Sequence, residues 1–277
     1  MADGLYKFLA DPNSVELVLN GAIKFSPICE LNDPSELSPT LVVDEVRASL
    51  VRLQRDGYRA EDVVHLHKQE RLLQRLAPAF RAISAPRTAA EATALVRSRL
   101  ADSIPLLELL LERTAREMSS KVGLFCLSGR FDSLPMWAHY AANAAGLVVE
   151  FRDLAGVFDG DETGILNQPI AVRYQKERTG VTFDPRSHEG LFFDKFQDWS
   201  YEQEVRVVLP LAECRRETVG ARTVYLYDIP PHHVSRVILG WNISPEKAAL
   251  VRAVAARQPT PVEVVQASFR RGRVEVG

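Results

Sequence analysis

The sequence has little that would direct the chain to a membrane or to an oxidising compartment. Its first residues contain neither the basic nor the apolar segment of a secretory signal. No apolar run approaches the ~20 residues needed to span a bilayer. The three cysteines, Cys29, Cys126 and Cys214, are odd in number and far apart, so we expect reduced thiols. These absences predict a cytoplasmic protein with no membrane partner.

The marks of common cofactor and nucleic-acid sites are also missing. A net charge of −2 gives no general attraction for nucleic acid. The sequence has no glycine-rich dinucleotide loop, phosphate-binding loop, CxxC pair or GxSxG nucleophile turn. His65 with His67, and His232 with His233, are more typical of solvated helix and turn positions than of metal ligands, so we expect no metal.

What is present is the composition of a globular protein, with 46% hydrophobic and 25% charged residues. Several predicted strands follow one another without a helix between them. This order favours an α+β fold with a mixed, largely antiparallel sheet over regular βαβ alternation. Strands are predicted at 5–8, 22–26, 123–128, 146–151, 169–174, 204–209, 223–229, 234–240 and 262–269, and helices at 15–20, 134–143, 189–199 and 245–257.

Residues 38–120 have a different pattern, with apolar residues repeating at helical spacing. One helix ends at Gly57, a second is expected over 63–76, and Thr88 and Glu91 form a capping box that opens a third. We therefore expect residues 1–277 to form a single α+β domain with 38–120 as a helical insertion.

Two groups of candidate binding residues lie near the start of the chain. Tyr6 and Lys7 are neighbours on a strand, so one of them can face a cleft while the other faces solvent or core. Ser26 ends the next strand, and Asn32 and Asp33 follow in an Asn-Asp-Pro turn. The alternatives are a surface lysine beside a core tyrosine, and a purely structural turn.

Large amphipathic side chains are concentrated in residues 136–141, Met-Trp-Ala-His-Tyr-Ala. On a helix, Met136 and Tyr140 share one face, and His139 lies between that face and the one carrying Trp137. Such a segment can form an aromatic wall that stacks on a base or on nicotinamide. The alternative is core packing with a hydrogen-bonded histidine.

A row of charged residues begins a late strand. Val205, Val207 and Leu209 form its apolar face. The other face carries Glu202, Glu204, Arg206 and Val208, a set that can hold a sugar or a developing positive charge. The alternative is a solvated face with a cross-strand ion pair.

In combination these motifs resemble a bacterial family called domain of unknown function 2971. The segments concerned are LYKF, FSP with ELNDPSE, LFCLS with MWAHYA and GLVVEF, DKFQDWSYEQEVRVVL, and VSRVILG, in that order. The likeness spans nearly the whole chain and is least distinctive over 38–120. The family name carries no activity.

The order of elements is also similar to ADP-ribosyltransferase-like folds, whose sheet is split. Those enzymes hold NAD with an early-strand residue and act at the nicotinamide ribose with a late-strand glutamate. The likeness implies Tyr6 or Lys7 for the first role and Glu204 or Glu202 for the second. The chain has no early-strand histidine or arginine and no Ser-Thr-Ser segment of the kind those enzymes often carry.

This resemblance implies an NAD-dependent ADP-ribosyltransferase or NAD glycohydrolase, with a toxin or phage-defence role as its context. Glu204, Glu202 and His139 are the candidate catalytic residues. The candidate binding residues for NAD are Tyr6, Lys7, Ser26, Asn32, Asp33, Trp137, Tyr140 and Arg206. A non-catalytic module that binds a nucleotide or a protein is the alternative, and a nuclease is a weaker one.

Two spatial expectations follow. Asn32, Asp33 and Glu36 should approach the 136–141 helix. Glu204 should face a cleft near His139 or Tyr140, and replacing it with glutamine should remove charge while leaving folding nearly unchanged.

Overall fold

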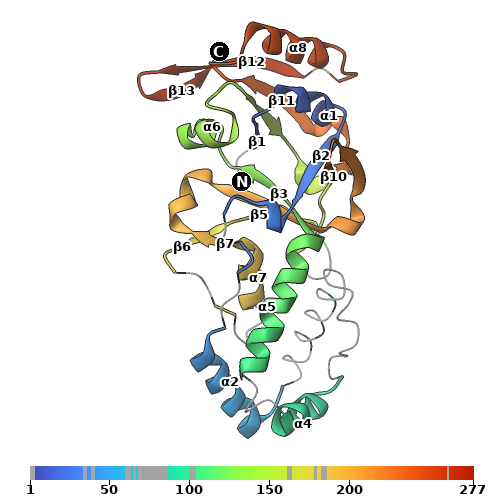
Figure 1. The fold of residues 1–277 in the computed structure, drawn as a ribbon, viewed down its shortest axis with the longest axis vertical. Coiled ribbons are helices and arrows are strands. Elements are labelled where there is room, and N and C mark those ends of the chain that lie inside the picture. The colour runs from blue at the N-terminus through green and yellow to red at the C-terminus, as the bar shows by residue number, and fades with distance from the viewer. Residues whose placement is uncertain are drawn as a thin grey trace.

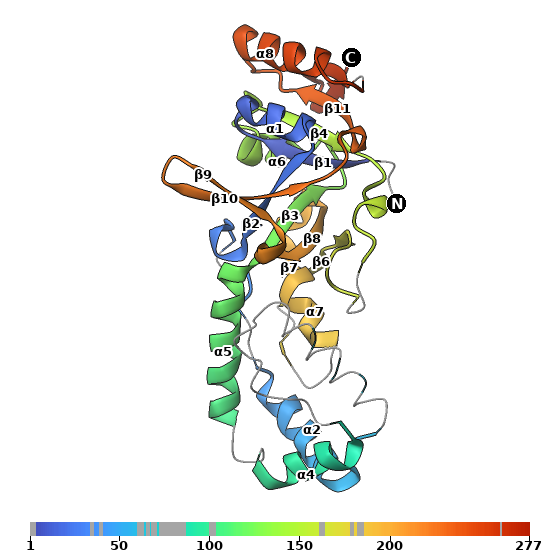
Figure 2. The same cartoon turned by 90° about the vertical axis from the view of Figure 1, so that its right-hand side faces the viewer.

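The structure is a computed structural model, and it describes residues 4–33, 36–38, 41–59, 64, 67, 71, 87–99, 104–160, 164–177, 180–181, 186–260 and 262–277. The molecule is elongated, with a sheet-rich part at one end and helices at the other (Figure 1). A long helix, α5 (Ile104–Lys121), runs from the sheet toward the helical end in both views (Figures 1 and 2).

One sheet of eleven strands forms the core of the sheet-rich part. It follows the order β13-β12-β11-β4-β1-β3-β2-β10-β9, and β8 and β5 extend it from the other edge of β3. Among the described strands of this sheet, only β11 and β12 pair in parallel. The strands are β1 (Leu5–Leu9), β2 (Ala22–Pro27), β3 (Val122–Ser128), β4 (Leu147–Phe151), β5 (Ile170–Ala171), β8 (Glu204–Pro210), β9 (Arg215–Val219), β10 (Arg222–Asp228), β11 (Val234–Leu239), β12 (Glu263–Arg270) and β13 (Arg273–Val276).

The sheet forks along one edge of β3. Strand β8 pairs with β3 along its full length, so β1 and β2 must both lie on the opposite edge. There β1 meets β3 at Ser128, and β2 meets it at Gly123 and Leu124. Neither strand pairs with Cys126, which lies between those two points. The two strands therefore diverge and leave a space between them.

The two faces of the sheet are covered by different helices because alternate strand residues face opposite sides. In β4, Leu147 and Val149 pack with α1 (Val15–Leu19) and α8 (Pro245–Ala256). Val148 faces the other side and packs with α6 (Leu134–Tyr140). A third apolar cluster joins α5 (Ile104–Lys121) and α7 (Arg186–Phe193) to the sheet. The sheet is thus buried on both faces.

The described parts of residues 38–120 contain α2 (Val43–Asp56), α4 (Ala89–Arg99) and most of α5. Helix α2 ends at Gly57, whose φ of 75° suits glycine. The backbone N–H of Glu91 donates to Thr88 Oγ1 (3.2 Å), as the capping box predicted. The helix expected over 63–76 lies largely outside the described residues. The division into one domain with an insertion stays a prediction.

The predicted helix over 189–199 is wrong in its second half. Helix α7 ends at Phe193, and the chain continues as β7 (Asp194–Phe196) and a 3₁₀ helix, η5 (Gln197–Glu202). β7 pairs in parallel with β6 (Arg173–Gln175), and Asp194 accepts a hydrogen bond from Arg173 (2.7 Å). Strand pairing and the ion pair of the buried Asp194 with the half-exposed Arg173 therefore override the local helical pattern.

Three further differences concern strands and a helix end. The strand expected over 169–174 is two strands, since β5 pairs with β8 and β6 pairs with β7. β9 and β13 were not predicted, because both are short, rich in charged residues and largely exposed. Helix α6 ends at Tyr140, since the next turn is left-handed, with φ of 50°, 54° and 62° at residues 142–144.

The predicted fold class is confirmed: helices surround a large mixed sheet whose pairs are mostly antiparallel. In the part of the chain that the structure describes, no helix combines the length and the apolarity needed to cross a bilayer.

Candidate functional site

A cavity of about 260 Å³ lies where β1 and β2 diverge from β3. Strand β1 contributes Tyr6, Lys7 and Phe8 to its wall, β3 contributes residues 124 and 126–128, and β8 contributes Glu204 and Arg206. This volume lies just below the range of about 300–1,000 Å³ for small-molecule sites. The cavity therefore suits one nucleoside-sized group better than a whole dinucleotide.

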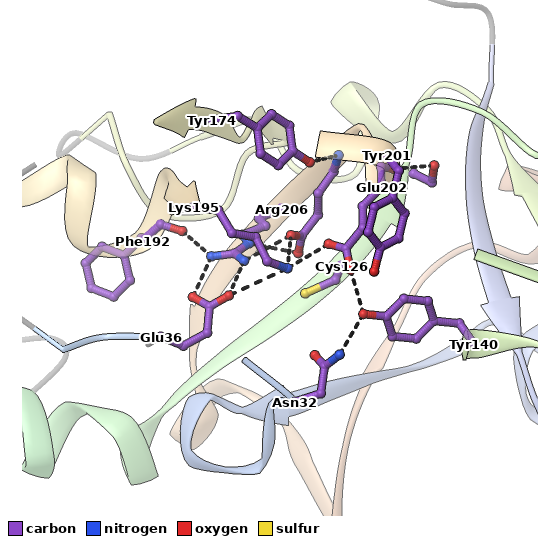
Figure 3. Close-up of polar contacts among 12 residues, drawn as sticks. Asn32, Glu36, Cys126, Tyr140, Tyr174, Phe192, Lys195, Tyr201, Glu202 and Arg206 are labelled. Atoms are coloured by element: carbon purple, nitrogen blue, oxygen red, sulfur yellow. Dashed lines mark hydrogen bonds and ion pairs between the residues drawn. The ribbon is translucent and has the colours of Figure 1, made fainter. Parts of the chain in front are cut away.

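The charged wall of the cavity is built on the alternation of β8. Val207 and Leu209 face the core cluster under α1 and α8. Glu204 and Arg206 face the opposite side and are both buried. Lys195 of β7 and Glu36 of the segment 36–38 complete the group (Figure 3). Four charged side chains from three separate segments thus meet in a buried ion-pair network.

Arg206 is the centre of this network and is fully buried. Its Nε and Nη2 donate to the two oxygens of Glu204 (2.8 and 3.0 Å). Nη1 donates to Glu36 Oε2 (3.0 Å) and to the carbonyl of Phe192 (2.7 Å), and Nη2 also donates to Glu36 Oε1. All five N–H donors of the guanidinium are therefore used within the protein.

Lys195 links the network to a further carboxylate, Glu202. Its Nζ donates to Glu202 Oε2 (2.6 Å) and to Glu204 Oε2 (3.0 Å), and it lies 4.8 Å from the centre of the Trp199 ring. Burial alone would lower the pKa of Lys195, but the charges of Glu204 and Glu202 outweigh it and raise that pKa. Lys195 is therefore a permanent cation.

Glu204 and Glu202 differ in their electrostatic surroundings. Burial tends to raise the pKa of Glu204, but Arg206 and Lys195 outweigh it and hold that pKa well below its ordinary value. Burial raises the pKa of Glu202, and Lys195 opposes this only in part. The two carboxyl groups therefore have pKa values shifted in opposite directions, with Glu204 the more firmly held as an anion.

A short chain of hydrogen bonds orients Glu202. Tyr140 Oη donates to Glu202 Oε1 (2.6 Å), and Asn32 Nδ2 donates to Tyr140 Oη (2.7 Å). Burial, followed by the Glu202 carboxylate, raises the pKa of Tyr140 well above its ordinary value, so this phenol keeps its proton. These contacts connect the turn after β2, helix α6 and η5 at the cavity wall (Figure 3).

Lys7 occupies the fork itself. Its Nζ donates to the carbonyl of Cys126 (2.8 Å), the residue that neither β1 nor β2 pairs with. Burial lowers the pKa of Lys7. Cys126 also faces the cavity, but burial followed by the charge of Glu204 raises the pKa of its thiol far above the ordinary range. Cys126 is therefore a protonated thiol rather than a nucleophile.

The cavity brings together eight of the residues singled out from the sequence. They are Tyr6, Lys7, Ser26, Asn32, Tyr140, Glu202, Glu204 and Arg206. The geometry separates their roles, however. Arg206 has no donor left for a ligand, and Glu204 is neutralised by two cations. Because Glu204 holds two buried cations, Glu204→Gln is expected to destabilise the fold, in contrast to the expectation from the sequence.

Three candidates do not line the cavity. Trp137 is 1% exposed and packs against Phe8 and Trp241 in the core, with its Nε1 donating to the carbonyl of Phe131 (2.6 Å). His139 is exposed and lies with Nδ1 3.3 Å from Tyr201 Oη. Asp33 is buried near the turn. Of the residues expected to approach α6, Asn32 contacts it through Tyr140, while Glu36 instead binds Arg206.

Sequence reasoning missed Lys195 and did not assign Glu36 to the charged group. Lys195 lies in a segment that was predicted to be helical. The local pattern therefore gave no indication that Lys195 belongs to a strand, β7. The available signal was charge balance, because the buried face of β8 carries more carboxylates than cations and requires a further cation.

Within the residues that the structure describes, no three His, Cys, Asp or Glu side chains are grouped as a metal site. Comparison with known proteins gives one match. No curated protein and no solved structure matches the chain. The model of the family described as Protein of unknown function (DUF2971) matches residues 136–207, which include Tyr140, Lys195, Glu202, Glu204 and Arg206. The family recognised from the sequence motifs is therefore confirmed over this segment of the chain.

Proposed function

We propose that the chain cleaves the N-glycosidic bond between nicotinamide and ribose in NAD, as an ADP-ribosyltransferase or an NAD glycohydrolase. The observation that carries the proposal is the setting of Glu202. Its carboxyl group is held between Tyr140 and Lys195 at the wall of a cavity of nucleoside size. Burial raises its pKa, the direction of change that a carboxyl group acting as a general base requires.

The chemistry requires little acid strength, because nicotinamide leaves as a neutral base. Positive charge develops on the ribose as the bond breaks, and a preorganised carboxylate stabilises that charge by a few kcal/mol. The carboxylate can then accept the proton of the attacking water or acceptor hydroxyl. Glu202 fits both tasks, since one of its oxygens is bonded to a neutral phenol rather than to a cation.

The ion pairs favour Glu202 over Glu204 for this role. Glu204 binds both Arg206 and Lys195, whereas the ion pair of Glu202 is with Lys195. Burial raises the pKa of Glu202, while the two cations hold the pKa of Glu204 below its ordinary value, so Glu202 is the carboxyl group less tightly held by cations.

The size of the cavity indicates which part of NAD it would hold. The nicotinamide riboside half fits the space between β1 and β2, and the adenosine half then lies outside the fork. Tyr6 and Tyr140 offer aromatic surface to the nicotinamide ring.

A specific observation also supports the alternative, a non-catalytic nucleotide-binding module. Two hydrogen bonds join Glu204 and Arg206, so the charges of these two side chains are already paired within the protein. In that case the cavity binds a nucleotide and releases it unchanged.

The proposal is tested by incubating the full chain with NAD and quantifying free nicotinamide by chromatography. Parallel reactions contain cell lysate or nucleic acid, which separates transfer from hydrolysis. Release of nicotinamide supports the proposal; saturable NAD binding without release supports the binding module. A toxin or phage-defence role further predicts that expression in bacteria depletes cellular NAD.

A further inference from the structure

Lys7 differs from the other cations of the cavity wall. Lys195 contacts Glu202 and Glu204, and Arg206 contacts Glu36 and Glu204. Lys7 instead donates to a neutral acceptor, the carbonyl of Cys126, and within the described structure it forms no ion pair. Among the described residues of this wall, Lys7 is therefore the basic group that no carboxylate contacts directly.

The fold places this amine at the open end of the fork. Divergence of β1 and β2 leaves the Cys126 carbonyl without a ladder partner, and Lys7 Nζ satisfies it at 2.8 Å. The side chain reaches that point across the Phe125 ring, with Nζ 5.5 Å from the ring centre. Burial lowers the pKa of Lys7, an effect that Glu204 opposes only in part, and a lowered pKa is one way in which a lysine becomes a better nucleophile.

We propose that Lys7 is the nucleophile of this site and forms a transient covalent bond with C1 of the ribose. The inference rests on the proposed function, because it assumes that the cavity holds the nicotinamide riboside half of NAD. It goes further in assigning covalent catalysis by an amine, in place of direct attack by water.

The step balances as follows. The lone pair of Lys7 Nζ forms the N–C1 bond, while the bond from C1 to the pyridinium nitrogen breaks and its electron pair leaves with neutral nicotinamide. The proton of the new ammonium passes to the Glu202 carboxylate. Opening of the sugar ring gives an imine between Lys7 and C1; addition of water then releases ADP-ribose and restores the amine.

An imine can be trapped by reduction, which makes the intermediate measurable. The full chain is incubated with NAD and sodium cyanoborohydride, digested, and mapped by mass spectrometry. We expect a reduced ADP-ribose adduct on the peptide containing Lys7, at an occupancy at least about ten times that of any other lysine. Because the mapping uses the unaltered chain, it does not depend on whether a variant folds.

Lys7→Arg provides the variant test. Arginine keeps the positive charge and can donate to the Cys126 carbonyl, but it cannot form the imine. We expect the adduct to disappear and nicotinamide release to fall by about 100-fold or more. The matched control is Lys24→Arg, an exposed lysine on β2, which should keep both the adduct at Lys7 and full turnover.

The possible results distinguish a failure of the covalent intermediate from a failure of the proposed function. Nicotinamide release with no adduct on Lys7 overturns the inference and leaves the proposed function standing. Adducts spread evenly over exposed lysines show unspecific glycation and also overturn it. If the unaltered chain neither binds nor cleaves NAD, the proposed function fails, and the inference fails with it.

Discussion

Replacing Glu204 with glutamine tests whether the buried network is structural. The carboxylate of Glu204 binds Arg206 through both oxygens and Lys195 through one. Glutamine keeps the shape but removes the charge that these two buried cations face. Removing one partner of a buried ion pair costs about 3–5 kcal/mol. Glu36 and Glu202 still face the cations, so we expect the lower end, about 3 kcal/mol.

Urea denaturation followed by tryptophan fluorescence measures this loss. With a slope of about 3 kcal/mol per molar urea, the midpoint should fall by about 1 M. The matched control is Glu217→Gln, which removes an exposed partner of Arg215 and should change the free energy of unfolding by less than about 1 kcal/mol.

The lowered pKa of Glu204 also predicts how the stability difference between the two chains changes with pH. Because the folded pKa of Glu204 is lowered, its stabilisation is fully present above the ordinary carboxyl pKa. It is lost as the pH falls toward and through the folded pKa. The stability gap between the unaltered chain and Glu204→Gln should therefore narrow in acid. A variant that is as stable as the unaltered chain at pH 7, yet inactive, would refute the structural role and make Glu204 the functional carboxylate.

Two further substitutions distinguish residues that act in the cavity from residues that pack in the hydrophobic core. Tyr140→Phe removes the hydrogen bond that lowers the pKa of Glu202, so the acid limb of the pH–rate profile should move to higher pH; an unmoved limb contradicts the assigned base. Trp137→Ala should cost about 3–5 kcal/mol in unfolding free energy, because this side chain fills the core beside Phe8. NAD binding by the folded fraction of Trp137→Ala should match that of the unaltered chain, and a selective loss of binding would place Trp137 in the site.

Strands whose residues alternate clearly between apolar and polar could be predicted from the sequence. The VxVxL pattern of β8 correctly predicts that Val207 and Leu209 face the core while Glu204 and Arg206 share the other face. Glu202 reaches the same network by a different route. It lies in η5, before Gln203 turns the chain with a φ of 43°. Strand periodicity alone therefore does not explain its position.

Contacts between residues far apart in the sequence could not be predicted from local patterns. Glu36 and Arg206 are 170 residues apart, and no local pattern joins them. Helical spacing could not decide between Trp137 and Tyr140, because both lie on apolar directions of α6. The structure assigns Trp137 to the core and Tyr140 to the cavity, since the sheet face that receives α6 sets the rotation of the helix.

The role of Glu202 is the central claim, and a paired measurement tests it most directly. Nicotinamide release from NAD and urea stability are measured for the unaltered chain and for Glu202→Gln. Lys195 keeps Glu204 as a partner after this change, so we expect Glu202→Gln to lose less stability than Glu204→Gln and to remain folded. Turnover should fall by about 100-fold or more, because the group that accepts the proton is lost. Unchanged nicotinamide release by a stably folded Glu202→Gln would contradict the account.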